Sequence, residues 1–131
     1  MKLLLDTHIF IWWSNNSPEI SSRLHTIQEA EQSGEKLNIS IMTLWEIAML
    51  AAKGRLEIAS SIDSWFERLE EQPNLSILPL NSRIVIESLR LGENFPKDPA
   101  DQLIAATARV HGLRLVTADE RIVKSGVAAV L

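Results

Sequence analysis

Cysteine is absent from this chain of 131 residues, and so is any long apolar run. The missing cysteines exclude a disulfide framework, a thiolate metal site and a thiol nucleophile, and they leave oxygen atoms as the main metal donors. The opening MKLLLDTHIFIWW begins like a signal peptide, but Asp6 interrupts its apolar stretch well before the roughly 7 to 15 residues that such a segment requires. We therefore expect a soluble protein of the cytoplasm without a membrane-spanning segment.

A surplus of basic residues is also missing. The chain has 17 acidic and 13 basic residues, which gives a net charge of −4. This balance argues against a nucleic acid held by a broadly basic surface. The argument weakens if several carboxylates share one pocket, because a bound divalent cation would reverse the charge there.

Repeats, linkers and low-complexity segments are absent as well, so we expect one domain over residues 1–131. Apolar strands are predicted at 2–5, 37–40, 75–80, 113–116 and 127–131. Helical patterns separate them, at 7–13, at 120–124 and in segments that end near Gly34, Gly54, Pro73, Gly92 and Gly112. Strands alternating with helices predict an α/β three-layer sandwich, in which helices cover both faces of a parallel sheet.

Several of the expected helices begin with a capping signal. Thr43 and Glu46 have the spacing of a capping box, and Asp98 precedes a proline that suits the first helical position. Other residues of capping type stand at the remaining starts, namely Ser21 or Ser22, Ser61 and Asn81.

Four carboxylates follow expected strands or lie in the first turn of the next helix, namely Asp6, Glu46, Asp101 and Asp119. Ligands of open parallel sheets bind at this edge, where successive crossovers leave in opposite directions. Each residue also has a structural explanation, because Glu46 and Asp101 suit helix caps and Asp6 and Asp119 suit turns. Four such coincidences at one edge favour a shared site.

Carboxylates gathered within a few ångströms raise one another's pKa unless a cation neutralises them. Carboxylate and water ligands suit hard ions, so Mg²⁺ or Mn²⁺ is the expected metal. Such an ion polarises a phosphodiester and lowers the pKa of a bound water. Phosphodiester hydrolysis is therefore the reaction that needs the fewest additional groups.

Three residues are accessory candidates. Thr117 is a polar residue at the end of an apolar strand, and its hydroxyl is a candidate for a hydrogen bond to a carboxylate or to a metal-bound water. His8 either orients a water or a phosphate or is structural, and Asp98 is expected to be a cap. The tryptophans at 12, 13, 45 and 65 are expected mainly in the core or in interfaces rather than stacked on bases. Five basic residues suit either a phosphate groove or a solvated surface: Lys53, Arg55, Lys97, Arg121 and Lys124.

The motifs taken together carry a family resemblance. The segments LLLDTH at 3–8, TLWEIA at 43–48, KDPADQLIAATA at 97–108 and LVTAD at 115–119 are similar to those of PIN-domain ribonucleases, and within these to VapC-type toxins of bacterial toxin–antitoxin pairs. The resemblance implies a five-stranded, mainly parallel sheet in the order 3-2-1-4-5. It also implies a metal-dependent endoribonuclease acting on RNA, a homodimer, and inhibition by a cognate antitoxin protein.

The same resemblance places the acidic quartet of the family on Asp6, Glu46, Asp101 and Asp119, with Thr117 as the polar accessory. The chain departs from the subgroup that it most resembles at two places. Residues 95–99 read FPKDP where His-Arg-Asp-Pro is common, and Gln102 follows the helical aspartate where an arginine is common. No carboxylate is lost, but an arginine able to bind phosphate through two hydrogen bonds is missing.

Two other functions stay open at this point. An aspartate at the tip of the first strand also suits aspartyl-phosphate phosphotransfer or a receiver-like domain. Against it, His8 stands where a second aspartate would be expected, and no aspartate ends the strand near Leu80. The other alternative is a non-catalytic interaction domain whose carboxylates only cap helices.

Overall fold

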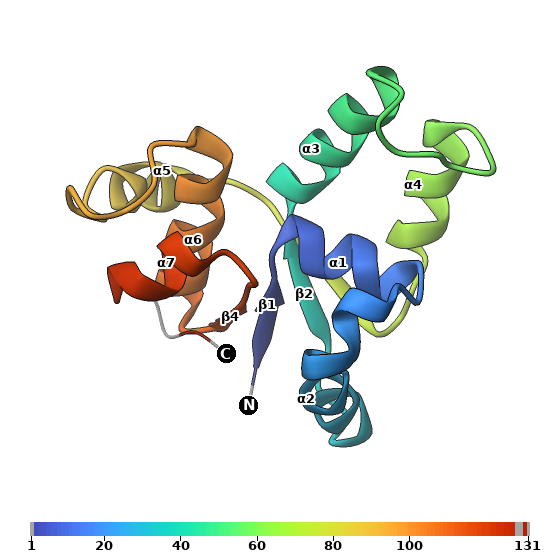
Figure 1. The fold of residues 1–131 in the computed structure, drawn as a ribbon, viewed down its shortest axis with the longest axis horizontal. Helices are drawn as coiled ribbons and strands as arrows, with labels where there is room; N and C mark the ends of the chain where they lie inside the picture. Colours follow the sequence, from blue (N-terminus) through green and yellow to red (C-terminus); the bar gives the residue numbers. More distant parts are fainter. Residues whose placement is uncertain (1, 128–129, 131) are drawn as a thin grey trace.

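A parallel sheet forms the centre of the fold in the computed structural model, which describes residues 2–127 and 130 (Figure 1). Its strands are β1 (Leu3–Leu5), β2 (Leu37–Ser40), β3 (Leu75–Leu78) and β4 (Arg114–Val116). They are ordered β3-β2-β1-β4, and each neighbouring pair is parallel. β1 therefore lies inside the sheet, between β2 and β4.

Helices make up the connections between the strands, as the sequence predicts. The first crossover contains α1 (Thr7–Ser14), the 3-10 turn η1 (Pro18–Ile20) and α2 (Ser21–Gln32). The second contains α3 (Ile41–Ala52) and α4 (Ile62–Glu70), and the third contains α5 (Ser82–Ser88) and α6 (Pro99–His111). The last helix, α7 (Glu120–Ser125), follows β4. The expected α/β architecture is confirmed.

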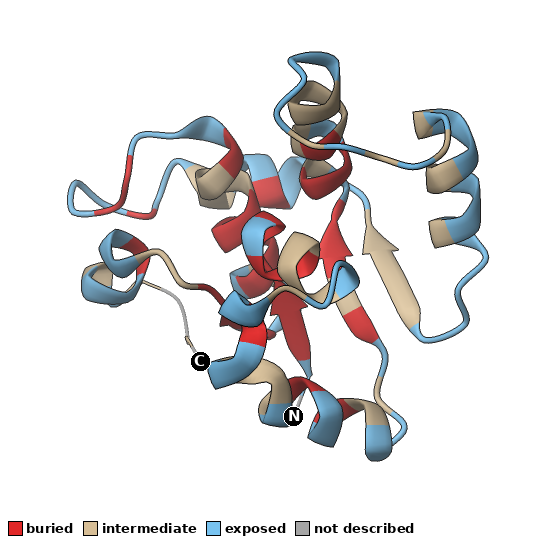
Figure 2. Ribbon diagram, turned by 45° about the vertical axis from the view of Figure 1, so that its right-hand side comes forward, coloured by how far each residue is buried: buried red, intermediate tan, exposed pale blue. Residues whose placement is uncertain are grey.

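The side chains of β1 show how the sheet separates two apolar cores. Leu3 and Leu5 pack on one face with a cluster that includes Phe10 of α1, whereas Leu4 packs on the other face with Ile104 of α6. All three leucines are buried, and the buried strands run through the middle of the molecule (Figure 2). This alternation, which follows from the two-residue period of a strand, makes the fold three layers thick.

A fifth strand was predicted at 127–131, and residues 128, 129 and 131 lie outside the described part of the chain. Val130 forms a parallel bridge with Leu115 of β4. Because Leu115 also pairs with Leu4 of β1, Val130 lies on the opposite edge of β4. The described strands thus follow the order 3-2-1-4, and Val130 stands where the order 3-2-1-4-5 places its fifth strand.

Three predicted helix starts are confirmed, because Ser61, Asn81 and Asp98 each accept a hydrogen bond from the backbone of the helix they cap. The predicted capping box of Thr43 and Glu46 is wrong. β2 runs directly into α3, so Ser40 caps this helix by accepting a hydrogen bond from Met42 N at 3.0 Å. Thr43 and Glu46 consequently lie inside the helix and are available for other contacts.

The predicted caps of α2 are also wrong. This helix follows η1 directly, and Ile20 at the cap position makes no side-chain hydrogen bond. α5 ends at Ser88, earlier than the predicted stop at Gly92. Among the helices described, none combines the length and the apolar character that crossing a bilayer requires.

Candidate functional site

An acidic cavity of about 330 Å³ opens where β1 and β4 end. Five carboxylates line it, namely Asp6, Glu46, Asp98, Asp101 and Asp119, together with Thr7, His8, Trp12 and Arg121 among others. The structure therefore brings all four residues of the predicted quartet into one cavity, with Asp98 and His8 beside them. Thr117 is fully buried and contacts two of the carboxylate residues from within the fold.

Asp6 joins β1 to β4 and begins α1. Its backbone N–H donates to Val116 O at 3.0 Å, and its Oδ1 accepts from Ile9 N at 2.9 Å as the cap of the helix. The residue is 9% exposed. This burial raises the pKa of Asp6, an effect that hydrogen bonds from Thr117 and Ile9 oppose. Asp6 is thus held by both the sheet and the helix.

Glu46 is held by hydroxyl groups rather than by a helix terminus. Thr7 Oγ1 donates to Glu46 Oε1, and the Thr7 and Thr43 hydroxyls lie 3.0 Å apart. Both threonines are buried, so the hydroxyl pair fixes the orientation of the carboxylate toward the cavity. Burial raises the pKa of Glu46, the hydrogen bond from Thr7 lowers it, and the charge of Asp98 raises it again.

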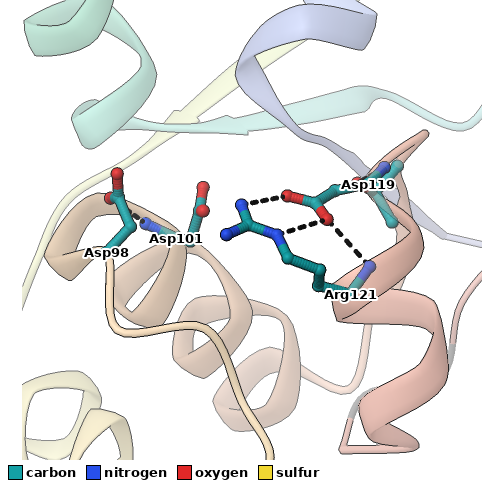
Figure 3. Close-up of polar contacts among 5 residues, drawn as sticks. Asp98, Asp101, Asp119 and Arg121 are labelled. Carbon is teal, nitrogen blue, oxygen red and sulfur yellow. Dashed lines mark hydrogen bonds and ion pairs between the residues drawn. The ribbon is translucent and has the colours of Figure 1, made fainter.

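Asp98 and Asp101 have different roles at the start of α6. Asp98 Oδ1 accepts a hydrogen bond from Asp101 N at 3.1 Å and caps the helix, with Pro99 as its first residue. The side chain of Asp101 has no hydrogen bond or ion pair with any residue that the structure describes. Burial, followed by the charges of Asp98 and the other three carboxylates, raises the pKa of Asp101 to about 6. No described residue therefore makes a direct hydrogen bond or ion pair with this carboxylate, although the Arg121 guanidinium extends toward it (Figure 3).

Asp119 follows β4 and caps α7, where its Oδ1 accepts from Arg121 N at 2.9 Å. The Arg121 guanidinium binds the same carboxylate twice, from Nη2 to Oδ2 at 3.0 Å and from Nε to Oδ1 at 3.3 Å. These contacts, the side-chain hydrogen bonds of Arg121 first, lower the pKa of Asp119. Thr117 Oγ1 accepts from Asp119 N at 3.1 Å and also bonds the Asp6 carboxylate, so this one threonine positions both residues.

The chemistry of the donor set suits a hard divalent cation. Carboxylate oxygens are the ligands that Mg²⁺ and Mn²⁺ prefer, and the unpaired Asp101 supplies negative charge that a cation would offset. With the side chains as they stand, no three acidic or histidine residues in the described part of the chain converge around one point. The Arg121 guanidinium extends from Asp119 toward Asp101 (Figure 3). The residues fit a metal by type and location, and binding one requires this arginine and the carboxylates to rearrange.

A second cavity of about 320 Å³ adjoins the acidic one and shares Thr7, His8, Glu46 and Asp98 with it. Its remaining lining includes Trp45, Lys53 and Arg55. Trp45 is 53% exposed, so of the two predicted places for the tryptophans, the core or an interface, the core is excluded for this residue. Trp12, Trp13 and Trp65 pack against the core cluster of β1, as predicted.

A third hollow of about 460 Å³ has a different character. Half of its described lining residues are apolar, including Phe10, Trp13, Trp65 and Leu69, and the other half are polar, with Glu31 as the one carboxylate and Arg68 as the one arginine. A groove that combines aromatic side chains with few charges suits a protein segment better than a phosphodiester.

Two residues of the acidic cavity were not recognised from the sequence as parts of the site. Thr7 was assigned only to a helix, although a polar residue next to Asp6 in an otherwise apolar segment was a usable signal. Arg121 was noted only among the cations of a possible phosphate groove. Its position two residues after Asp119 is compatible with the ion pair that the structure contains but does not by itself predict it.

The fold is a parallel sheet with acidic residues gathered at the carboxyl ends of its strands. Comparison of the sequence with known protein families shows which family has this arrangement. The sequence pattern of the PIN domain matches residues 3–127, and the chain belongs to this family. A similar protein is Ribonuclease VapC22 of Mycobacterium tuberculosis, which is 33% identical over 120 residues, covering 92% of this chain and 88% of that protein. The resemblance expected from the four motifs is thereby confirmed.

Solved structures support the same fold. The crystal structure of VapBC2 from Rickettsia felis, bound to a DNA fragment from the promoter, superposes with a TM-score of 0.74 at 18% identity, covering 100% of this chain and 98% of that chain. A toxin–antitoxin complex from Klebsiella pneumoniae gives a TM-score of 0.65 at 22% identity, covering 99% of this chain and 96% of that chain. At these identities the two similarities concern the fold alone.

Proposed function

We propose that this protein is a Mg²⁺- or Mn²⁺-dependent endoribonuclease and that it acts in the cytoplasm as the toxin of a type II toxin–antitoxin pair. Membership of the PIN family supports the nuclease activity, and so does the similarity to a protein named as a ribonuclease. The proposal depends most on one observation, which is the unpaired Asp101 carboxylate among four other carboxylates in a single cavity.

A purely structural role does not account for Asp101. Asp98 already caps α6 by accepting from the Asp101 backbone N–H, and the Asp101 side chain makes no hydrogen bond or ion pair with a described residue. Clustered like charges are costly in a folded protein unless a cation compensates them. Asp101 therefore has the properties of a ligand residue.

The four carboxylates of Asp6, Glu46, Asp101 and Asp119 would hold the metal. A divalent cation supplies a Lewis acid that offsets the charge of a phosphodiester and lowers the pKa of water. The chain contributes orientation: Thr7 holds Glu46, and Thr117 holds Asp6 and Asp119. Asp98 fixes the first turn of α6 and thereby the position of Asp101, and His8 lines both neighbouring cavities, where it suits contact with the RNA.

The proposal is tested by RNA cleavage. We expect the wild-type protein to cleave a mixed RNA pool in Mg²⁺ or Mn²⁺ and to lose this activity in EDTA. Asp101→Asn removes one ligand charge and keeps the size of the side chain, so the rate should fall by about two orders of magnitude or more. The matched control is Asp63→Asn, which changes an exposed carboxylate in the first turn of α4 and should cleave like the wild type. Cleavage that persists in both EDTA and Asp101→Asn would refute the proposal.

The two alternative functions receive less support. Asp6 is buried and one of its oxygens binds Ile9 N, so it is poorly placed to attack an external phosphoryl donor. Labelling of Asp6 by acetyl phosphate would nevertheless favour that reading. Helix capping accounts for Asp6, Asp98 and Asp119 but not for Glu46 or Asp101, which argues against a domain with carboxylates that only cap. A melting temperature unaffected by saturating Mn²⁺ would favour the capping explanation.

A cognate antitoxin is the proposed protein partner. The similarity to a toxin–antitoxin complex supports it, and the groove lined in part by Phe10, Trp13 and Trp65 offers a surface for a protein segment. Expression of the chain alone should arrest bacterial growth, and co-expression of the antitoxin should relieve the arrest. Arrest of equal strength by Asp101→Asn would show that the toxicity does not depend on RNA cleavage.

A homodimer is the proposed assembly. α5 exposes Val85 and Ile86, and Leu89 at its C-terminal cap is 82% exposed; exposed apolar surface of this kind favours association. The molar mass from light scattering should therefore be that of a dimer for the wild type and that of a monomer for Leu89→Glu. A wild-type monomer at micromolar concentration would contradict this assembly.

A further inference from the structure

Arg121 brings a permanent positive charge into the acidic cavity. Its guanidinium makes two hydrogen bonds to the Asp119 carboxylate, at 3.0 and 3.3 Å. Among the described residues that line the cavity, it is the one arginine, and the cavity has no lysine in its lining. The side chain extends toward Asp101 (Figure 3), and attraction to Asp119 first, then to Asp101 and Asp98, raises the pKa of the guanidinium.

We propose that Arg121 is a built-in counter-ion of this cavity and that it exchanges with the divalent metal for Asp119. The inference rests on the proposed function, because it assumes that Asp119 is a metal ligand. In the metal-free protein the guanidinium neutralises part of the carboxylate cluster. When a metal binds, Asp119 turns to the metal and the arginine leaves its carboxylate.

The geometry makes this exchange possible at modest cost. The Arg121 side chain is 70% exposed, so it moves into solvent without disturbing the core. The backbone N–H of Asp119 keeps its hydrogen bond to Thr117, and the exchange needs only Oδ2, which the guanidinium binds, so Oδ1 stays available to the α7 backbone. Exposed ion pairs are weak, so the arginine competes with a divalent cation without excluding it.

The released guanidinium gains a second role. A free arginine at the rim of a metal site presents planar donors that match a phosphate group. Gln102, which follows Asp101, carries no positive charge. Among the described lining residues, Arg121 is therefore the arginine available to bind a phosphate of the RNA. The same residue thus compensates the cluster before the metal binds and contacts the RNA backbone afterwards.

Calorimetric titration with Mn²⁺ tests the exchange without relying on activity. Arg121→Gln removes the competing charge, and the dissociation constant for Mn²⁺ should fall about fivefold relative to the wild type. Arg121→Lys keeps the charge but not the paired hydrogen bonds, so its affinity should lie between the two. The matched control is Arg109→Gln, which removes an arginine paired with Glu87 at 3.0 Å outside the cavity, and its affinity should equal that of the wild type.

The outcomes separate this inference from the proposed function. Unchanged or weaker Mn²⁺ binding by Arg121→Gln would overturn the exchange, even if the wild type cleaves RNA. Tighter binding by Arg121→Gln would support the exchange, even if no RNA is cleaved. If neither the wild type nor any variant binds Mn²⁺, both proposals are wrong. With tighter metal binding, Arg121→Gln should also show a higher KM for RNA in saturating Mn²⁺, because the phosphate contact is lost.

Discussion

Replacing Asp101 by asparagine should stabilise the metal-free protein at neutral pH, although it removes a residue of the proposed active site. The folded-state pKa of Asp101 is about 6, raised from 3.8 by burial and by the neighbouring carboxylates. The folded chain therefore binds more protons than the unfolded chain between about pH 4 and pH 6. Stability falls as the pH rises through this window, and above pH 6 the full cost of the charge is present.

The magnitude follows from the size of the pKa shift. About two pKa units correspond to about 3 kcal/mol for a fully buried group. Asp101 is half-buried, so screening by solvent reduces the cost to about 1–1.5 kcal/mol. For a domain of this size we expect Asp101→Asn to raise the melting temperature by about 3–5 °C at pH 7.5 in EDTA. At pH 4, where Asp101 is protonated in the folded protein, the two proteins should melt at nearly the same temperature.

Differential scanning calorimetry at the two pH values measures this effect. Asp63→Asn is again the matched control. The Asp63 carboxylate is exposed in the first turn of α4 and interacts favourably with the helix dipole, so its removal should not stabilise the protein. Saturating Mn²⁺ should reverse the order: at 100 times the dissociation constant the metal adds about 2.7 kcal/mol to the wild type and far less to Asp101→Asn. A melting temperature of Asp101→Asn at pH 7.5 that does not exceed that of Asp63→Asn would refute the reasoning.

Two further predictions concern the groups that hold the site and its helix in place. Thr117→Val removes a buried hydroxyl that bonds both Asp6 and Asp119, so the free energy of unfolding measured in urea should fall by about 1–3 kcal/mol. The control is Thr107→Val, which removes only a hydrogen bond to Leu103 O within α6. A fall no greater than that of Thr107→Val would contradict the role of Thr117. Gly112 ends α6 at φ +65°, and Gly112→Ala should lower the free energy of unfolding by about 1–2 kcal/mol, whereas an unchanged urea midpoint would show that the left-handed turn is not required.

Local signals predicted the start and end of α6 correctly. An aspartate followed by a proline fixes the first turn, and a glycine fixes the left-handed turn that ends the helix. The convergence of Asp6, Asp101 and Asp119 was also predictable, because parallel strands place their carboxyl ends at one edge of the sheet. These inferences depend on chain geometry alone and need no knowledge of side-chain packing.

The sequence signals failed where two residues competed for one role. Ser40 and Thr43 both suit a cap, and the sequence does not show that β2 ends at Ser40 and leads directly into α3. Because Ser40 caps α3, Glu46 lies inside the helix and accepts a hydrogen bond from the Thr7 hydroxyl instead. Likewise, the pairing of Arg121 with Asp119 depends on the arginine's conformation in α7, which spacing alone does not determine.

The pairing of β1 with β4, the first and last of the named strands along the chain, means that the cluster of carboxylates is completed late in synthesis. β1 pairs with β4, and the two strands are separated by the three crossovers of the fold. A ribosome that has translated the message only as far as β3 has produced Asp6 and Glu46 but neither Asp101 nor Asp119. A nascent chain of that length therefore holds half of the proposed ligands, and the proposed site is complete only after Asp119 has been synthesised.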